Sequence, residues 1–401
     1  MRIAITIRTF YPKSGGLQAH AEKLALELIS RGHQVTIFTR SISHSPSYQD
    51  YFFFSESVSE TKINDLEVKV LRHPKLANIL MWVISKCIHR TYLTPVAIYL
   101  INIIFTGQIL KHLQGVDVIH HVGQAHELIG FAAATAAHRI NIPFLIQPTL
   151  HPNQWGDSKL DIALYSWANH LLVHTNFEQQ SLEKYNLKGI TYHLVGNGVD
   201  DRNDGNGQNF RDKYNINSHM VLFLGRKSID KGYPLIKQSF KLLQKERADV
   251  TLVCMGSSEH NQQPEVRESG IVEIYFADEK DKHDALSACT MLCVPSEGES
   301  FGLVYMEAGR YKKPVIARNL PVLKELLGQY QAALLVGSPY GEGNQVKVTP
   351  EELRDAMNYL INNNEVAKNI GENAYKVSEN FTWSKVVSLF ENAYNQARIG
   401  Y

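Results

Sequence analysis

Two glutamates, Glu299 and Glu307, are separated by seven residues, and both can accept hydrogen bonds from the hydroxyl groups of a ligand. The apolar run 290–294 predicts a strand, and a proline and a glycine that follow it predict a loop. A helix that starts at Ser300 would carry Glu307. Seven residues of helix rise roughly 10 Å, which is comparable to the reach from the ribose of a nucleoside diphosphate to an attached sugar.

The space between the two acids suits a diphosphate. The first N–H groups of a helix have no partners within the helix, and the helix dipole attracts anions. This predicts that the amides at the helix start bind phosphate oxygens, namely those of Ser300, Phe301, Gly302 and Leu303. The spacing of the acids alone also fits two ordinary surface glutamates, one in a loop and one on an exposed helix face.

Two cations follow another predicted strand, 221–224. That strand leads into Gly225 and Arg226, and Lys231 comes shortly after. Ligands of open α/β sheets bind beyond the carboxyl ends of the strands, so both cations are expected to face a ligand and neutralise its diphosphate. The alternative is a surface ion-pair cluster with Asp230.

These motifs resemble the retaining nucleotide-sugar glycosyltransferases of family 4. The match to the family signature extends over 295–317, and the family pattern Gly-Arg, spacer, Lys-Gly is also complete. The resemblance implies that Glu299 contacts the hydroxyls of the donor sugar and that Glu307 contacts the ribose. It also implies that Arg226 and Lys231 stabilise the departing diphosphate.

The same resemblance implies transfer of a hexose-type sugar from a nucleoside-diphosphate sugar to a hydroxyl acceptor, with retention of configuration. A glycan, a lipid-linked glycan or a small molecule would serve as acceptor, and the departing diphosphate oxygen would take its proton. The sequence has no Asp-x-Asp motif, so we expect neither a metal nor another cofactor. Two alternatives stay open: an epimerase or phosphorylase on the same scaffold, and a non-catalytic protein that binds sugar or lipid.

Glycines after other strands are further candidates for donor binding. Gly15 and Gly16 precede a predicted helix over 17–31 and would let the backbone approach a ligand closely. Relatives place this loop beside the diphosphate and the acceptor. Gly256 follows the predicted strand 251–255. A simple tight turn explains such glycines equally well.

Four histidines lie near predicted strand ends of the first half. The predicted strand 116–120 ends at His120, and His121 and His126 follow it. Because the family has a histidine beyond this strand that reaches the donor sugar, His121 or His126 is the catalytic candidate. His120 and His151 are candidates for the acceptor side. Any one of these histidines is also explained by a structural hydrogen bond.

Strand-like and helical runs alternate along the 401 residues, which predicts an α/β protein with two domains. The resemblance implies the GT-B architecture, in which two facing doubly wound (Rossmann-like) domains enclose the active site. We expect an acceptor-binding domain over 1–196, joined by a C-terminal helix at about 382–401, and a donor-binding domain over 197–381. The other predicted strands are 3–7, 34–38, 68–71, 144–146, 171–174, 192–195, 272–276, 291–294, 315–317 and 333–336.

The composition excludes some partners and sets the expected compartment. With 41 basic and 40 acidic residues the net charge is +1, so binding to nucleic acid is not expected. The 4 cysteines form no Cys-x-x-Cys pair and fit reduced thiols. The chain starts with a predicted strand rather than a leader, which predicts a cytoplasmic protein.

One uncharged apolar stretch, 91–110, adds a further question about location. It is near the length of a membrane-spanning helix, although its polar residues weaken that interpretation. A buried helix, a helix at a membrane surface and a true span all remain open. A surface helix would place the protein peripherally on the inner face of the membrane and would suit a lipid-linked acceptor.

Overall fold

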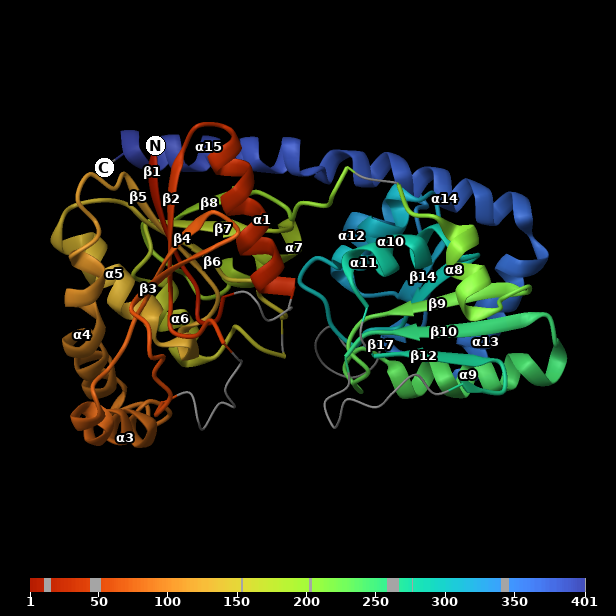
Figure 1. Ribbon diagram of the computed structural model, residues 1–401, viewed down its shortest axis with the longest axis horizontal. Helices are drawn as coiled ribbons and strands as arrows, with labels where there is room; N and C mark the ends of the chain where they lie inside the picture. The colour runs from red at the N-terminus through yellow and green to blue at the C-terminus, as the bar shows by residue number, and fades with distance from the viewer. Residues whose placement is uncertain are drawn as a thin grey trace. The chain divides into compact units, whose positions relative to one another are not determined.

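The computed structural model describes residues 1–10, 16–43, 52–152, 154–201, 204–257, 267–275, 277–339 and 346–400. The chain divides into two compact units (Figure 1). Unit 1 comprises Met1–Gly198 and Trp383–Tyr401, and unit 2 comprises Val199–Thr382.

Unit 1 is built on an eight-stranded sheet with the order β3-β4-β2-β1-β5-β6-β7-β8. The described pairings are parallel except for the β3–β4 hairpin at one edge. The order runs outward from β1 in both directions, so the switch point of this sheet lies between β1 and β5. The strands are β1 (Arg2–Thr6), β2 (Gln34–Thr39), β3 (Glu60–Ile63), β4 (Leu66–Val70), β5 (Val118–Val122), β6 (Phe144–Gln147), β7 (His170–Val173) and β8 (Thr191–Leu194).

Helices cover both faces of this sheet, and the last helix of the chain returns to it. That helix, α15, contacts α1, β5 and β7 (Figure 1). An apolar cluster that includes Phe131, Phe144 and Tyr165 fills the space between the sheet and its helices. The helices are α1 (Gly16–Ser30), α3 (Asn78–Cys87), α4 (Thr94–Leu110), α5 (Ile129–Arg139), α6 (Lys159–Tyr165), α7 (Asn176–Glu183) and α15 (Trp383–Ile399), with short 3-10 turns η1 (Lys75–Ala77) and η2 (Ala125–Glu127).

Unit 2 has a seven-stranded sheet with the order β11-β12-β10-β9-β13-β14-β15, whose switch point lies between β9 and β13. Its central strands are mostly buried runs of apolar residues, as expected when helices cover both faces of a parallel sheet; the pairing of β11 with β12 at one edge is antiparallel. The strands are β9 (His219–Leu224), β10 (Val250–Met255), β11 (Arg267–Glu268), β12 (Ile271–Ile274), β13 (Met291–Val294), β14 (Val315–Arg318) and β15 (Leu334–Val336), beside the hairpin β16 (Ser338–Pro339) and β17 (Val346–Lys347).

The helices of unit 2 connect successive strands and then follow one another at its end. Several begin with good capping residues; for example, Thr349 and Glu352 form a capping box at the start of α13. The helices are α8 (Gly207–Tyr214), α9 (Tyr233–Glu246), α10 (Glu279–Ala288), α11 (Leu303–Arg310), α12 (Pro321–Leu326), α13 (Pro350–Asn362) and α14 (Asn364–Ser378), with 3-10 turns η3 (Gly328–Tyr330) and η4 (Glu379–Phe381).

The predicted class, α/β with two doubly wound units, is confirmed, but two predicted boundaries near the site were wrong. The strand expected at 116–120 is β5 and continues through Val122, because His121 and Val122 pair with β1 and β6. The helix expected to start at Ser300 starts at Leu303, because Gly302 has a φ of 87° and cannot continue a helix.

The uncharged stretch 91–110 contains the whole of α4, whose residues Ala97, Ile101 and Phe105 face the interior of unit 1. Among the residues that the structure describes, no helix combines the length and apolar character needed to cross a membrane.

Candidate active site

The candidate donor site lies at the switch point of unit 2, beyond the carboxyl ends of β9 and β13. These two strands are parallel neighbours, with Leu222 paired to Leu292. The loop after β9 carries Arg226 and Lys231, and the loop after β13 carries Glu299. The connections that follow these two strands run in opposite directions along the sheet, and open α/β sheets bind ligands beyond the strand ends at such a point.

Lys231 and Glu299 form an ion pair with 2.8 Å between Nζ and Oε1. Their side chains are 20% and 9% exposed, so the pair is largely shielded from water but can still be reached. The two loops are also joined through their backbones, because the amide of Glu297 donates to the carbonyl of Asp230 at 2.8 Å. The structure therefore brings together two residues that lie 68 positions apart in the chain.

Gly232 makes this approach of the two loops sterically allowed. Its φ is 74°, and a Cβ at this position would lie 2.4 Å from the carbonyl oxygen of Pro295. Any side chain would therefore both strain the backbone and push the loop of Lys231 away from the loop of Glu299. The Lys-Gly dipeptide thus has a structural reason that the sequence alone does not reveal.

Arg226 is more exposed than Lys231, with 51% of its side chain accessible. It pairs with Asp230 at 2.9 Å. The surface ion pair that the sequence offered as the alternative to phosphate binding is therefore present. An exposed pair of this kind is worth little free energy.

Gly225 and Gly256 lie at the ends of the neighbouring strands β9 and β10. The amide of Gly225 donates to the carbonyl of Met255 at 3.0 Å, and a Cβ on Gly256 would come within 1.9 Å of the carbonyl oxygen of Gly225. Gly256 therefore allows the two loops to pass closely and this contact alone accounts for it, whereas a Cβ on Gly225 would meet nothing within 4 Å.

The start of α11 differs from the prediction in a way that affects anion binding. Gly302 is the residue before the helix, and the amide of Tyr305 is already bonded to its carbonyl at 3.1 Å. The first-turn amides are thus those of Leu303 and Val304, whereas Ser300 and Phe301 precede the helix. The Phe301 ring is buried against Phe381, with 5.0 Å between ring centroids. Its role is to anchor the loop.

Glu307 lies on α11 as predicted, and Lys282 of α10 is its partner at 2.9 Å. Burial alone would lower the pKa of Lys282, but the carboxylates of Glu307 and Glu279 outweigh burial and raise this pKa. Lys282 therefore stays charged and holds Glu307 in place. Sequence reasoning missed Lys282 because it lies in the middle of a charged helix with no motif around it.

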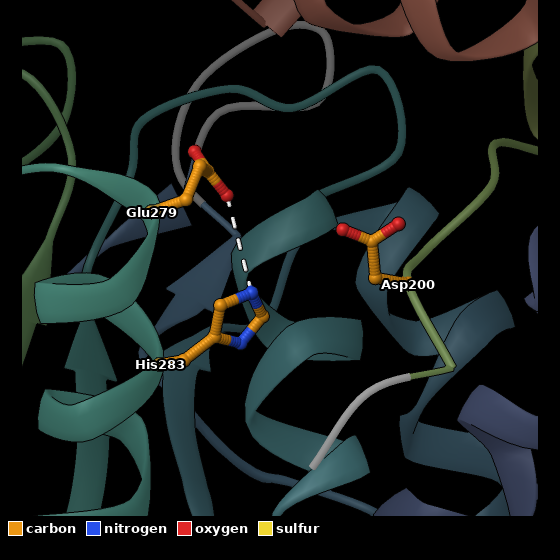
Figure 2. A group of neighbouring side chains, drawn as sticks. All are labelled: Asp200, Glu279 and His283. Atoms are coloured by element: carbon orange, nitrogen blue, oxygen red, sulfur yellow. Dashed lines mark ion pairs between the residues drawn. The ribbon is translucent and has the colours of Figure 1, made fainter. Parts of the chain in front are cut away.

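A group of three side chains beside Lys282 has the residue types of a metal site. Asp200, Glu279 and His283 offer ligand atoms that lie within 4.8 Å of one another. Figure 2 draws these three side chains. The Nε2 of His283 is 4.0 Å from Glu279, whose carboxylate also contacts the ammonium of Lys282 at 2.7 Å. Lys282 thus already supplies positive charge to this carboxylate, and we assign no metal to the group.

Arg318, the last residue of β14, binds the loop that carries Glu299. Its Nε donates to the carbonyl of Pro295 at 2.8 Å, and its Nη1 donates to the carbonyl of Val346 at 2.7 Å. Nη2 also pairs with Glu297 at 3.2 Å. Burial lowers the pKa of Arg318, and the Glu297 carboxylate acts in the opposite direction. Its place at a strand end is a signal that could have identified it.

In unit 1 the two adjacent histidines of β5 lie in the core, which corrects the expectation that His121 follows the strand. His120 is fully buried, and its Nδ1 is 2.9 Å from the hydroxyl of Tyr394 on α15. His121 is also fully buried, with Nδ1 2.9 Å from Oγ1 of Thr6 on β1. Burial lowers the pKa of His121 to about 4, so this imidazole is neutral. The two side chains bind other parts of unit 1 and do not reach its surface.

The remaining candidates of unit 1 are more accessible. Burial lowers the pKa of His126, a third of whose side chain is exposed, and Asp161 lies 3.8 Å from its Nδ1. His151 stacks on Trp155, with 4.2 Å between ring centroids. Gly16 is the first residue of α1. Gly15 lies outside the described residues.

A buried chain of polar side chains in unit 1 escaped the sequence analysis. The imidazole of His20 on α1 lies between Asn197, 2.6 Å from Nδ1, and Gln147, 2.9 Å from Nε2. Gln147 also bonds His174 at 2.8 Å. The atoms that face Nδ1 and Nε2 are the side-chain oxygens of Asn197 and Gln147, and burial lowers the pKa of His20.

The last member of this network of buried polar side chains is Glu178 of α7, which is fully buried. Its carboxylate accepts from the amides of Leu150 at 2.8 Å and His174 at 2.6 Å, and burial raises its pKa to about 7. The network ties α1 to the carboxyl ends of β6 and β7 and fixes the loop that leads to His151. Gln147 and His174 could have been identified from the sequence by their position at the ends of strands, whereas nothing in the sequence distinguishes His20.

Two doubly wound units, each built on a sheet with a switch point between neighbouring parallel strands, make up the GT-B architecture. The sequence family described as Glycosyltransferase Family 4 matches residues 14–203. The family described as Glycosyl transferases group 1 matches residues 207–377. The chain therefore belongs to the nucleotide-sugar glycosyltransferases of the family 4 type.

Individual relatives agree with this family. A D-inositol 3-phosphate glycosyltransferase of Corynebacterium glutamicum is 26% identical over 96% of this chain and 92% of its own. An uncharacterized glycosyltransferase of Methanocaldococcus jannaschii is 26% identical over 74% of this chain and 80% of its own. Anabaena HepE, solved in complex with UDP-glucose, has the same fold, with a TM-score of 0.71 at 15% identity over 98% of this chain and 99% of its own.

Proposed function

We propose that this chain is a retaining glycosyltransferase that moves a hexose-type sugar from a nucleoside-diphosphate sugar to a hydroxyl acceptor without a metal ion. The observation that carries the proposal is the shielded ion pair of Lys231 with Glu299 at the switch point of unit 2. In this proposal unit 2 binds the donor and unit 1 binds the acceptor.

The ion pair is compatible with donor binding because an ammonium group has three donor hydrogens. Lys231 can keep one hydrogen bond to Glu299 and direct the others to phosphate oxygens. Glu299 retains acceptor positions for the hydroxyls of the donor sugar. Arg226 then leaves Asp230 for the diphosphate, since a bidentate arginine–phosphate contact exceeds an exposed ion pair.

The other end of the donor lies at Glu307, which would accept hydrogen bonds from the ribose hydroxyls while Lys282 holds it in place. The charge that develops on the leaving diphosphate falls to Arg226, Lys231 and the first amides of α11. These groups act by prior orientation in a partly shielded site. The acceptor proton passes to the departing diphosphate oxygen, so the protein needs no strong base.

The first experiment is a panel of nucleoside-diphosphate sugars, with release of the free nucleoside diphosphate as readout. UDP-glucose belongs in it because a structural neighbour was solved with that ligand. An inositol phosphate is a rational first acceptor, given the relative named for that activity. Conversion of the donor with the nucleotide still attached would instead indicate an epimerase, and binding without turnover would indicate a non-catalytic protein.

Removal of the cations tests the site itself. We expect Lys231→Ala and Arg226→Ala each to lower kcat/KM by roughly 100-fold, which corresponds to about 3 kcal/mol of transition-state stabilisation. Lys213→Ala is a matched control, because Lys213 is also a 51% exposed cation of unit 2 in an ion pair, here with Asp281 at 3.0 Å. Wild-type turnover in the double variant of Arg226 and Lys231 would refute the assignment.

A chelator tests the expected independence of metals. Because the proposal assigns the neutralisation of the diphosphate to cationic side chains and helix amides, we expect EDTA dialysis to leave turnover within about twofold of the untreated enzyme. A loss that Mg²⁺ or Mn²⁺ restores would contradict this expectation. Glu279→Ala and His283→Ala would then show whether the group in Figure 2 holds the ion.

A further inference from the structure

Helices α3 and α4 carry large apolar side chains on the face that points away from the core of unit 1. On α3 these are Ile79 and Trp82, and on α4 they are Val96, Tyr99 and Ile103. Trp82 is 54% exposed and Tyr99 is 66% exposed. The spacings of three and four residues place each set on one stripe of its helix. Leu76 and Tyr92, in the segments that flank α3, are also exposed.

The opposite faces of the same helices are already buried. Met81 and Ile84 of α3 and Ile101 and Phe105 of α4 are fully covered, and α4 packs against both α3 and α5 (Figure 1). A surface helix normally carries polar residues on its outer face, whereas α4 has no charged residue along its length. A contiguous outer face of this kind indicates an interaction surface.

The charge around this face has one sign. Between residues 72 and 116 the chain has five lysines and arginines and no aspartate or glutamate, although the whole chain is nearly neutral. All five are exposed, and none forms an ion pair with another described residue. Lys86 continues the stripe of Ile79 and Trp82, and Lys111 continues the stripe of α4. The five residues are Arg72, Lys75, Lys86, Arg90 and Lys111.

From this arrangement we infer that the outer face of α3 and α4 docks on the surface of a bilayer that contains anionic lipids. The apolar and aromatic side chains would enter the boundary between headgroups and acyl chains, and the basic side chains would contact the lipid phosphates. No segment needs to cross the membrane. This inference goes beyond the proposed transfer reaction, because it assigns the enzyme a place rather than a chemistry.

A cavity beside the face favours lipid over a protein partner. About 680 Å³ of space lies between α4 and the region of α6, lined mainly by apolar side chains that include Ile98, Tyr99 and Trp167. Tyr99 belongs to both the cavity and the exposed stripe. A flat protein surface would leave such a space unfilled, whereas a mobile acyl chain can enter it.

The test is cosedimentation of the full chain with vesicles, without donor or acceptor, so that its result is independent of glycosyl transfer. Vesicles of equal parts phosphatidylglycerol and phosphatidylcholine are compared with phosphatidylcholine alone. We expect binding to the anionic vesicles that weakens as salt screens the charges. The double variants Trp82→Ser/Tyr99→Ser and Lys86→Glu/Arg90→Glu should each bind about tenfold more weakly.

Matched controls come from unit 2. Tyr330→Ser/Tyr359→Ser removes two exposed aromatic side chains, and Lys368→Glu/Lys376→Glu reverses two exposed charges. Both should bind vesicles like the wild type. Thermal unfolding shows whether each variant is folded; the charge reversal tests the inference even if the apolar variant is unstable.

Two outcomes would overturn the inference. One is a wild-type protein that stays in the supernatant with anionic vesicles at low salt. The other is a wild-type dimer, seen by light scattering, that becomes monomeric in Trp82→Ser/Tyr99→Ser while neither form binds vesicles. In that case a second copy of the chain covers the face.

Discussion

At the scale of single residues, each charged side chain assigned to the donor already has a partner of opposite charge. Lys231 pairs with Glu299, Arg226 with Asp230, and Lys282 with Glu307. Such pairing holds the side chains in defined positions before a ligand arrives. Substitution of one residue of a pair therefore also leaves its charged partner without its counter-ion.

Glu299→Gln separates a donor contact from an ordinary surface acid. The amide keeps the shape of the side chain but loses the charge that attracts Lys231 and sugar hydroxyls, so we expect kcat to fall by at least about 100-fold. Glu297→Gln is the control from the same loop; its side chain is 45% exposed and Arg318 retains two carbonyl partners without it. Steady-state kinetics of the two variants should therefore differ, and equal effects would argue against a specific role for Glu299.

At the scale of elements, the sequence identified the parallel strands well because buried strands read as apolar runs ended by glycine or proline. It ended β5 at His120 rather than at Val122, since the polar residue His121 resembles the start of a loop until it is seen to bond Thr6. It also started α11 three residues early. The backbone of Gly302 decides that boundary, and a positive φ is set by packing rather than by composition.

In the candidate site, too, the sequence reveals local motifs but not the contacts between distant segments. Motif spacing predicted Glu299, Glu307, Arg226 and Lys231 without reference to their contacts. It could not predict Lys282, because its importance depends on the ion pair with Glu307 on a different helix, α11. The buried chain around His20 was missed for the same reason, since its members come from segments far apart in the sequence.

A glycine comparison tests whether the approach of two loops matters for donor binding. Gly232 and Gly189 have nearly the same φ, 74° and 73°, but a Cβ on Gly189 would meet nothing within 4 Å. Alanine at either position costs about 1 kcal/mol of backbone strain. Only Gly232→Ala also displaces Lys231 from Glu299, so we expect it alone to weaken donor affinity, by roughly tenfold or more. Calorimetric titration with the donor that is turned over measures the difference, and equal affinities would show that the clash is relieved without moving Lys231.

At the scale of the whole molecule, buried histidines are concentrated in unit 1. Burial lowers the pKa of His121 and His170 to about 4 and that of His174 to about 3. A histidine with a lowered pKa in the folded state contributes stability above its unfolded value of about 6.5, and this contribution is lost as the pH falls toward the folded value. Glu178 has the opposite effect. Its raised pKa favours the fold below about 4.5, and that benefit is lost as the pH rises toward 7.

The two opposing groups are neighbours, so Glu178 offsets His174 and the balance depends on the other buried histidines. His121 alone should cost unit 1 about 2 kcal/mol between pH 6.5 and pH 5. All 4 tryptophans, at positions 82, 155, 167 and 383, lie in unit 1, so their fluorescence monitors that unit alone. We therefore expect the thermal midpoint seen by tryptophan fluorescence to fall by several degrees between pH 7 and pH 5. Far-UV circular dichroism, which monitors both units, should retain a later transition at pH 5. A fluorescence midpoint that does not move over this range would show that the buried histidines of unit 1 do not govern its acid stability.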